Sequence, residues 1–207
     1  MRRCVIIGGA DIHDYEFTRT FLRPDDFFVC CDSGLKHCRG LGIEPHLIIG
    51  DFDSHADPHL PVETIVLPHE KDDTDTMAAV REMTSRGFDD FLLLGVFGNR
   101  MDHTLANVYI LLWLDNRGKK ALAVDDQSEF MIVSRKPAYI SDRYPYFSLL
   151  TINGKAEGVT IKNAKYTLEN AALMPEYQCA VSNEPLPGQT TEVTVKDGVL
   201  LLIRDRQ

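Results

Sequence analysis

Short runs of consecutive apolar residues recur through the first 126 residues of the chain, and each run ends at a glycine or a polar residue. Apolar runs of about four to eight residues with such ends are typical of strands that are buried on both faces. The pattern predicts strands within residues 4–9, 27–34, 46–54, 64–68, 90–98 and 121–126.

Two of the intervening segments have the apolar period of a helix. A helix is predicted from Thr74 to Arg86, with Met77, Val80 and Met83 on its buried face and Gly87 as a stop. A second helix is predicted from His103 to Asn116, with Gly118 at its end and an inward face formed by Leu105, Val108, Leu112 and Trp113. Strands that alternate with helices predict an α/β fold: a mostly parallel, Rossmann-like sheet sandwiched by helices.

The pattern changes at about residue 128. Residues 129–134, 146–152, 158–168 and 192–203 are short, β-branched, alternating segments separated by glycine, proline and asparagine. Lys196-Asp197-Gly198 is a signal for a hairpin turn. The second part is therefore predicted to be a small antiparallel β-sandwich or barrel. The expected domains are residues 1–127, an α/β domain, and residues 128–207, a β-domain.

Composition and charge narrow the choice of partners. The chain has 207 residues and a formal net charge of −9, which argues against nucleic acid as a partner because phosphate neutralisation needs a basic face. No apolar run approaches the ~20 residues of a membrane span, and the amino terminus turns polar too early for a secretory signal. The five cysteines are odd in number and form no C-x-x-C pair, so a reducing cytoplasm is the expected location.

Three polar clusters follow predicted strands. The first is Gly50 to Ser54, in which Asp51 and Asp53 stand one residue apart. Carboxylates this close repel each other unless a cation lies between them, so the pair predicts a hard metal ion with oxygen ligands. The alternative is an acidic turn that caps a helix.

The second cluster is HEKDDTDTM, residues 69–77. Its aspartates precede or begin the first predicted helix, Thr74 can cap that helix, and Lys71 adds a positive charge. The alternative is capping together with a solvated surface. Because ligands of parallel sheets lie beyond the carboxyl ends of the strands, its position beside the first cluster favours binding of a metal or phosphate. Asp32 also follows a predicted strand.

The third cluster is GVFGNRMDHTLAN, residues 95–107. Its glycines let the backbone approach a ligand, and Arg100 offers a bidentate donor to a phosphate. Asp102 and His103 open the next helix, and Asn107 lies about one turn further on the same face. Each residue could instead have a structural role, with Asp102 as a helix cap and Arg100 as a surface charge.

Taken together, these clusters resemble the thiamine pyrophosphokinase family. The motifs that carry the resemblance are Gly50-Asp51-Phe52-Asp53-Ser54, Lys71-Asp72-x-Thr74-Asp75 and Gly98-x-Arg100-x-Asp102-His103-x-x-x-Asn107. Residues 147–149, 159–168 and 182–184 are similar to the C-terminal β-domain of that family. The resemblance implies transfer of a diphosphoryl group from ATP to the hydroxyl of thiamine, with Mg²⁺, giving thiamine diphosphate and AMP.

The resemblance also implies roles for individual residues. The implied metal ligands are Asp51, Asp53 and Asp75, which are catalytic together with Arg100 and Asp102. The implied ATP-side residues are Asp32, Ser54, Lys71, Asp72, Thr74, His103 and Asn107. The implied thiamine-side residues are Tyr166, Ser182 and Asn183, with Asp102, in a site at the interface of a homodimer. This chain departs from the family by having Tyr166 where many members have a tryptophan, and Cys31 and Ser33 around Asp32.

Three other functions use the same residue types. A metal-dependent nucleotide-sugar transferase also places Asp-x-Asp after a buried strand, and a phosphoesterase could use the Asp-His pair. A sensor could bind nucleotide or thiamine without catalysis. Formation of AMP in step with thiamine diphosphate, from thiamine, ATP and Mg²⁺, distinguishes the diphosphokinase from all three.

Overall fold

The computed structural model describes residues 3–52, 60–68, 70, 72–98 and 100–206. Asp53, Ser54 and Lys71, which the sequence singled out, lie outside the described residues. The chain divides into two compact units, Met1–Asp126 and Gln127–Gln207. None of the helices in the described ranges has the length and apolar character needed to cross a membrane.

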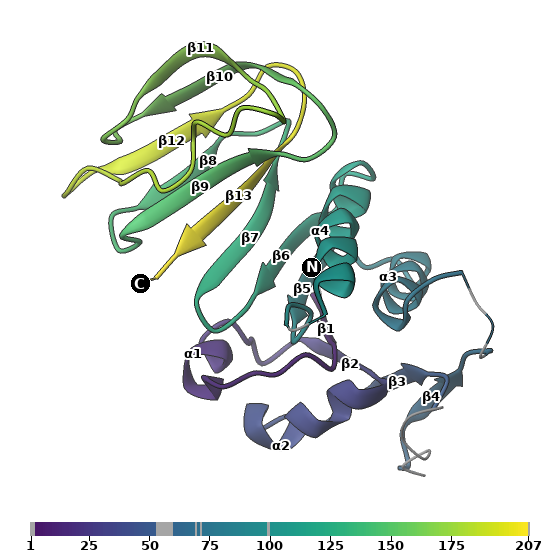
Figure 1. Ribbon diagram of the computed structural model, residues 1–207. Coiled ribbons are helices and arrows are strands. Elements are labelled where there is room, and N and C mark those ends of the chain that lie inside the picture. Colours follow the sequence, from purple (N-terminus) through teal and green to yellow (C-terminus); the bar gives the residue numbers. More distant parts are fainter. Residues whose placement is uncertain (1–2, 53–59, 69, 71, 99, 207) are drawn as a thin grey trace. The chain divides into compact units, whose positions relative to one another are not determined.

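The first unit is built on a parallel sheet (Figure 1). Its strands are β1 (Cys4–Ile7), β2 (Phe27–Cys31), β3 (Leu47–Gly50), β4 (Glu63–Val66), β5 (Asp90–Leu94) and β6 (Lys120–Val124). Their order is β4-β3-β2-β1-β5-β6, and every pair of neighbours is parallel. Each strand lies within or beside a predicted apolar run, so the predicted α/β fold is confirmed.

Short and long helices connect the strands. They are α1 (Tyr15–Arg19), the 3-10 helix η1 (Asp32–His37), α2 (Cys38–Leu41), α3 (Asp75–Ser85) and α4 (Met101–Asp115). Figure 1 shows α1 and α2 on one side of the sheet and α3 and α4 on the other. The face toward α1 and α2 buries Val5, Ile7, Cys30 and Leu92 against residues of those helices.

Two details of the sequence prediction are wrong. Helix α4 turns Ile110, Leu111 and Leu114 inward, whereas Leu105, which was expected inside, is 53% exposed. The helix has apolar residues on nearly every side, so their spacing could not select the buried face. Strand β4, predicted within residues 64–68 as a buried strand, lies at the edge of the sheet, and its Val66 is 63% exposed.

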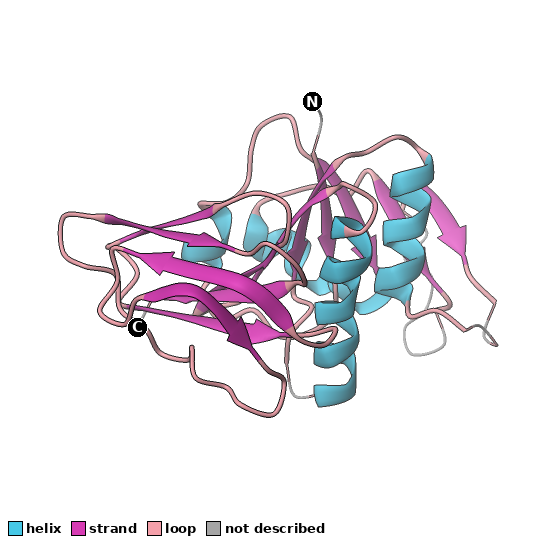
Figure 2. Cartoon of the chain, turned by 90° about the horizontal axis from the view of Figure 1, so that it is seen from above, coloured by secondary structure: helices cyan, strands magenta, loops and turns pink. Residues whose placement is uncertain are grey.

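The second unit contains two antiparallel sheets, which appear as stacked layers in Figure 2. One contains β7 (Ser128–Val133), β13 (Leu200–Asp205) and β9 (Tyr146–Thr151). The other has the order β11 (Leu168–Leu173), β10 (Ala156–Lys162), β12 (Thr190–Thr194) and β8 (Ala138–Ser141). Apolar side chains from both sheets form one core, including Phe147, Leu149, Val159, Val193 and Leu202. The predicted antiparallel sandwich is thus confirmed.

The turn at Lys196-Asp197-Gly198 is not a hairpin. Strand β12, before it, pairs with β10 and β8, whereas β13, after it, pairs with β7 and β9. The turn therefore carries the chain from one sheet to the other. Gly198 has φ +90°, a conformation that glycine adopts without steric cost, so the sequence identified a turn but not its partners.

Candidate active site

The first unit has a topological switch point between β1 and β5. The chain builds β1 to β4 toward one edge of the sheet and then returns to place β5 on the other side of β1. Loops that leave neighbouring strands in opposite directions open a crevice at their carboxyl ends, which is where α/β sheets bind ligands. Here the loops stay closely packed, because Gly8 N–H donates to Leu94 O and Ala10 N–H to Gly95 O, both at 2.8 Å.

Gly95 is required for this packing. It has φ +60°, and a Cβ atom on it would lie 2.7 Å from the carbonyl oxygen of Gly8. Any larger residue would therefore be strained both by its backbone conformation and by this contact.

A cavity of about 530 Å³ opens at these strand ends. Its lining comes from the segments that follow β1, β2, β3 and β5, from the first turn of α3 and from the first two turns of α4. The sequence-predicted residues that line it are Asp32, Asp51, Thr74, Asp75, Arg100, His103 and Asn107. Among the described residues predicted for the nucleotide side and catalysis, Asp72 and Asp102 are not part of this lining.

Three carboxylates meet in the cavity. Asp32 follows β2, Asp51 follows β3 and Asp75 begins α3, and one oxygen of each lies within 4.8 Å of the others. All three side chains are half-buried. Gly50 permits the approach, because a Cβ atom at that position would lie 2.9 Å from Cβ of Asp32. Three carboxylate oxygens at this spacing form a donor set that fits a hard divalent cation such as Mg²⁺.

Asp32 was expected on the nucleotide side rather than among the metal ligands. The sequence could not show that it lies beside Asp51, because 19 positions separate the two residues and only the pairing of β2 with β3 brings them together. The third expected metal ligand, Asp53, lies outside the described residues.

The amino end of α3 adds a positive electrostatic contribution. Thr74 caps the helix, since its Oγ1 accepts from Met77 N–H at 3.2 Å, and Asp75 lies in the first turn. The helix dipole places a partial positive charge at this end, which favours nearby anions. The capping role predicted for Thr74 is confirmed.

Two cationic side chains of the lining are paired with carboxylates. Arg100 binds Asp102 bidentately, with Nε–Oδ1 at 3.0 Å and Nη2–Oδ2 at 2.6 Å. Hydrogen bonding from Arg100 holds the pKa of Asp102 well below its usual range. Lys36 donates to Asp11 at 2.7 Å and lowers the pKa of that carboxyl in the same way. Both pairs are largely exposed, so their partners can be exchanged at little cost.

Sequence reasoning missed one wall of the cavity, formed by Gly8, Gly9, Ala10 and Asp11, and it missed Lys36. A signal existed for the wall, since two glycines directly follow the apolar run 4–7. Lys36 had no such signal, because it lies in a short 3-10 turn without an apolar period.

Asn107 connects two elements that line the cavity. Its side chain is 5% exposed, and Nδ2 donates to the carbonyl of Val96 at 2.6 Å. This bond ties α4 to the loop after β5, both of which contribute to the cavity. His103, one turn earlier, is exposed and also lines the cavity.

Of the four predicted thiamine-side residues, Tyr166, Ser182 and Asn183 lie in the second unit, whereas Asp102 lies in the first. Asn183 is 2% exposed; its Oδ1 accepts from Tyr166 N–H at 3.0 Å, and its Nδ2 donates to Tyr166 O at 2.7 Å. The ring of Tyr166 is 60% exposed, with Lys165 Nζ 5.6 Å from its centroid. Ser182 is held by Ser148 Oγ and has φ +56°, a conformation that costs a non-glycine residue about 1 kcal/mol or more.

Fold and site together define a class of protein. A parallel α/β unit with a carboxylate cluster, two exchangeable cations and a helix amino end at its switch point is suited to bind a phosphorylated ligand together with a cation. The attached antiparallel unit presents an exposed aromatic ring beside a fixed polar group.

Comparison with known proteins identifies the family. Residues 18–123 match the family model described as thiamin pyrophosphokinase, catalytic domain, and residues 132–200 match the one described as thiamin pyrophosphokinase, vitamin B1 binding domain. The chain belongs to the thiamin pyrophosphokinase family, a family of enzymes. Because the chain matches both the catalytic domain and the vitamin B1 binding domain of this family, the comparison favours this assignment over a sugar-nucleotide transferase, a phosphoesterase or a sensor.

Individual relatives agree with the family assignment. The thiamine pyrophosphokinase of Bacillus subtilis (strain 168) is 26% identical over 185 residues, which is 84% of either chain. A crystal structure of thiamine pyrophosphokinase from Bacillus subtilis has a TM-score of 0.85 and 22% identity, with 100% of both chains covered. The structure of thiamin pyrophosphokinase from Geobacillus thermodenitrificans has a TM-score of 0.82 and 25% identity, covering 100% of this chain and 98% of that one.

Proposed function

We propose that this chain transfers the diphosphoryl group of ATP to the hydroxyl of thiamine, giving thiamine diphosphate and AMP in an Mg²⁺-dependent reaction. The observation that carries the proposal is the convergence of Asp32, Asp51 and Asp75 within 4.8 Å at the switch-point cavity, in a chain of this family. An acidic protein can bind a polyanionic nucleotide only if cations offset the charge, and this cluster is where a cation fits.

The cation would be held by Asp32, Asp51 and Asp75, with Asp53, two positions after Asp51 in the sequence, as a fourth proposed ligand. When bound, Mg²⁺ screens the phosphate charge that opposes attack on the β-phosphorus. The half-buried positions of the three described carboxylates support this role, because partly dehydrated anions gain most from a cation.

Arg100 supplies the exchangeable positive charge. Its planar guanidinium suits a phosphate as well as a carboxylate, and its side chain is 71% exposed, so it is free to leave Asp102 for the nucleotide. Lys71 and His103 are proposed to act on the same anionic ligand, with Ser54, Asp72, Thr74 and Asn107 shaping the ATP side. Positioning and charge stabilisation, rather than covalent chemistry, are the main contributions expected for phosphoryl transfer.

The thiamine side is assigned to Tyr166, Ser182 and Asn183, together with Asp102. The exposed ring of Tyr166 offers a face for stacking and keeps the aromatic character of the tryptophan found in many relatives. Asp102 offers a carboxylate that is ionised at neutral pH whether or not Arg100 is bound to it, so that it can attract the positively charged thiazolium ring of thiamine.

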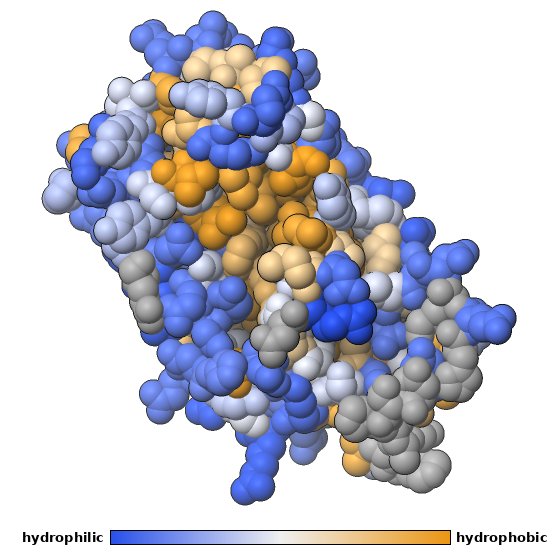
Figure 3. Space-filling view, viewed as in Figure 1, coloured by the Kyte–Doolittle hydropathy of each residue, from blue (hydrophilic) through white to orange (hydrophobic). Residues whose placement is uncertain are grey.

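We further propose that the active form is a homodimer, with the thiamine site at its interface. Met101, Leu105 and Tyr109, spaced four residues apart on α4, are 64%, 53% and 55% exposed and form an apolar stripe. Figure 3 shows apolar surface in the region of α4. The proposed location is the cytoplasm, which agrees with five cysteines that are all free thiols.

The test is a stoichiometric assay. Purified protein with thiamine, ATP and Mg²⁺ should form AMP and thiamine diphosphate in equal amounts, and chelation of Mg²⁺ by EDTA should stop both. Release of ADP or inorganic phosphate instead, or nucleotide cleavage without thiamine, would contradict the proposal. An inactive protein that still binds ATP and thiamine would indicate a sensor.

A further inference from the structure

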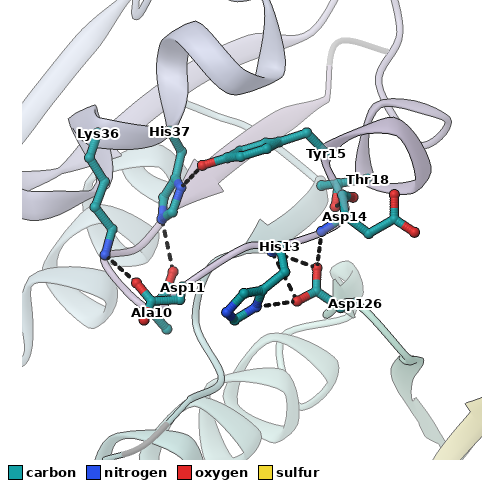
Figure 4. Close-up of polar contacts among 9 residues, drawn as sticks. All are labelled: Ala10, Asp11, His13, Asp14, Tyr15, Thr18, Lys36, His37 and Asp126. Carbon is teal, nitrogen blue, oxygen red and sulfur yellow. Dashed lines mark hydrogen bonds and ion pairs between the residues drawn. The ribbon is translucent and has the colours of Figure 1, made fainter.

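The backbone of Ala10, a residue of the cavity wall, is held from two sides through its two flanking peptide groups. Ala10 N–H donates to Gly95 O at 2.8 Å, and Ala10 O lies 2.8 Å from Nε2 of His37 (Figure 4). Ala10 and Gly95 both line the cavity, whereas His37 is not among its lining residues. His37 therefore contacts the wall from behind, at the end of η1, the helix that begins with Asp32.

The contacts of His37 fix which ring nitrogen carries the proton. A carbonyl oxygen can only accept, so the proton must be on Nε2, and Nδ1 is then an acceptor. Nδ1 lies 2.8 Å from the hydroxyl of Tyr15, which donates to it. The ring is only 2% exposed, and burial lowers the pKa of His37, so the neutral form with both hydrogen bonds is favoured.

The Ala10 hydrogen bond has a consequence for the next residue. In a trans peptide the carbonyl and the following N–H point in opposite directions, and no described peptide bond is cis. With its carbonyl turned to His37, the Ala10–Asp11 peptide directs the Asp11 N–H away from His37. We propose that His37 is a positioning residue that holds this N–H toward the cavity as a donor to the phosphates of the nucleotide, an inference that rests on the proposed function.

The other end of the same loop is held independently. His13 N–H and Asp14 N–H donate to Oδ1 of Asp126 at 3.0 and 2.9 Å, and the His13 ring also contacts that carboxylate (Figure 4). Loss of the His37 bond therefore leaves the loop anchored at Asp126 and at Gly95. The effect of a substitution at His37 should be confined to the orientation of one peptide, and this makes it measurable.

Two amides give a matched test. In His37→Gln the amide nitrogen reaches the place of Nε2 and can still donate to Ala10 O, whereas in His37→Asn it reaches only the place of Nδ1. The probe is the α,β-methylene analogue of ATP, whose scissile bridge is unreactive, with binding measured by calorimetry in the presence of Mg²⁺. We expect His37→Asn to bind it about tenfold more weakly or worse, since a bond to a charged group is lost, and His37→Gln to stay within about threefold of wild type.

A control separates this role from general stability. His46→Leu removes another histidine of the first unit that bonds a backbone group, since His46 Nδ1 accepts from Phe28 N–H at 3.0 Å, but His46 does not line the cavity. It should leave analogue affinity unchanged. In steady-state assays His37→Asn should raise the KM for ATP with a smaller change in the KM for thiamine.

Three results would overturn the inference: equal analogue affinities for His37→Gln and His37→Asn, an equal loss in His46→Leu, or an equal rise of both KM values. Should His37→Asn fail to fold, His37→Met replaces it, because the thioether offers no donor to Ala10 O; unchanged analogue affinity in that variant would also count against the inference. Wild-type protein that binds the analogue but makes no AMP would refute the proposed function instead, and the binding comparison would still decide the role of His37.

Discussion

Arg100 is the residue whose hydrogen-bond partner must change for the proposed reaction. Replacing Arg100 by alanine should lower turnover by about 100-fold or more, because the transferring phosphoryl group loses the bidentate guanidinium that stabilises its charge. Asp53→Asn should lower turnover by a similar factor, because it weakens the proposed cation site. Steady-state kinetics and circular dichroism would measure activity and folding. Arg117→Ala, which removes an arginine stacked 3.7 Å from the Trp113 ring, is the control and should stay active. Near-normal turnover in Arg100→Ala or Asp53→Asn would contradict the assignment.

His37 gives the first unit a pH dependence with a definite sign. Burial is the largest effect and lowers the pKa of His37, and repulsion from Lys36 lowers it further. The hydrogen bond to Ala10 and attraction by Asp11 and Asp126 raise this pKa and only partly offset the lowering. Because the folded pKa lies below that of the unfolded chain, protons bind preferentially to the unfolded state as the pH falls through about 6.5. The free energy of unfolding should therefore decrease on acidification.

The measurement is urea denaturation at about pH 7.5 and about pH 5.5, on either side of the ordinary histidine pKa. Wild type should lose stability between the two, and His37→Gln should lose less, since its side chain does not titrate. An equal loss in the variant would show that other groups cause the dependence.

At the scale of elements, α3 presents one aspartate of the cluster and depends on its cap. Thr74→Ala removes the bond to Met77 N–H and should destabilise the first unit by about 1 kcal/mol. Activity should also fall, because the first turn contains Asp75. Ser85→Ala is the matched control at the other end of the helix, where Ser85 Oγ donates to Glu82 O on the surface, and it should have a smaller effect. Equal losses in thermal unfolding would argue against a specific role of the cap.

Elements differed in how well their sequences predicted them. Strands β1, β2, β3 and β5 are continuous apolar runs because both of their faces are covered, so composition alone identified them. Helices α1 and α2 have five and four residues, too few to establish an apolar period. In α4 apolar residues occur on nearly every side of the helix, so the sequence identified a helix but not its buried face.

At the scale of the whole molecule, the apolar stripe on α4 predicts association. Leu105→Lys places a charge in the middle of the stripe and should shift the protein from dimer to monomer, because burying an unpaired ammonium group is unfavourable. Light scattering coupled to gel filtration measures this directly. Tyr139→Lys, at an exposed aromatic on β8 that is 59% accessible, is the control and should leave the mass unchanged. A wild-type chain that elutes as a single subunit would contradict the homodimer.

The sequence by itself determined the α/β class, the change to β-structure near residue 128, the acidic motifs and the cap at Thr74, because each depends on residues close together in the chain. Tertiary structure alone decided which acidic residues meet. Asp32 joins Asp51 and Asp75 because β2 pairs with β3 and α3 starts at the same edge, and the wall at Gly8 to Asp11 faces them because β5 lies beside β1. Strand order is set by packing across the whole sheet, and no local pattern of residues encodes it.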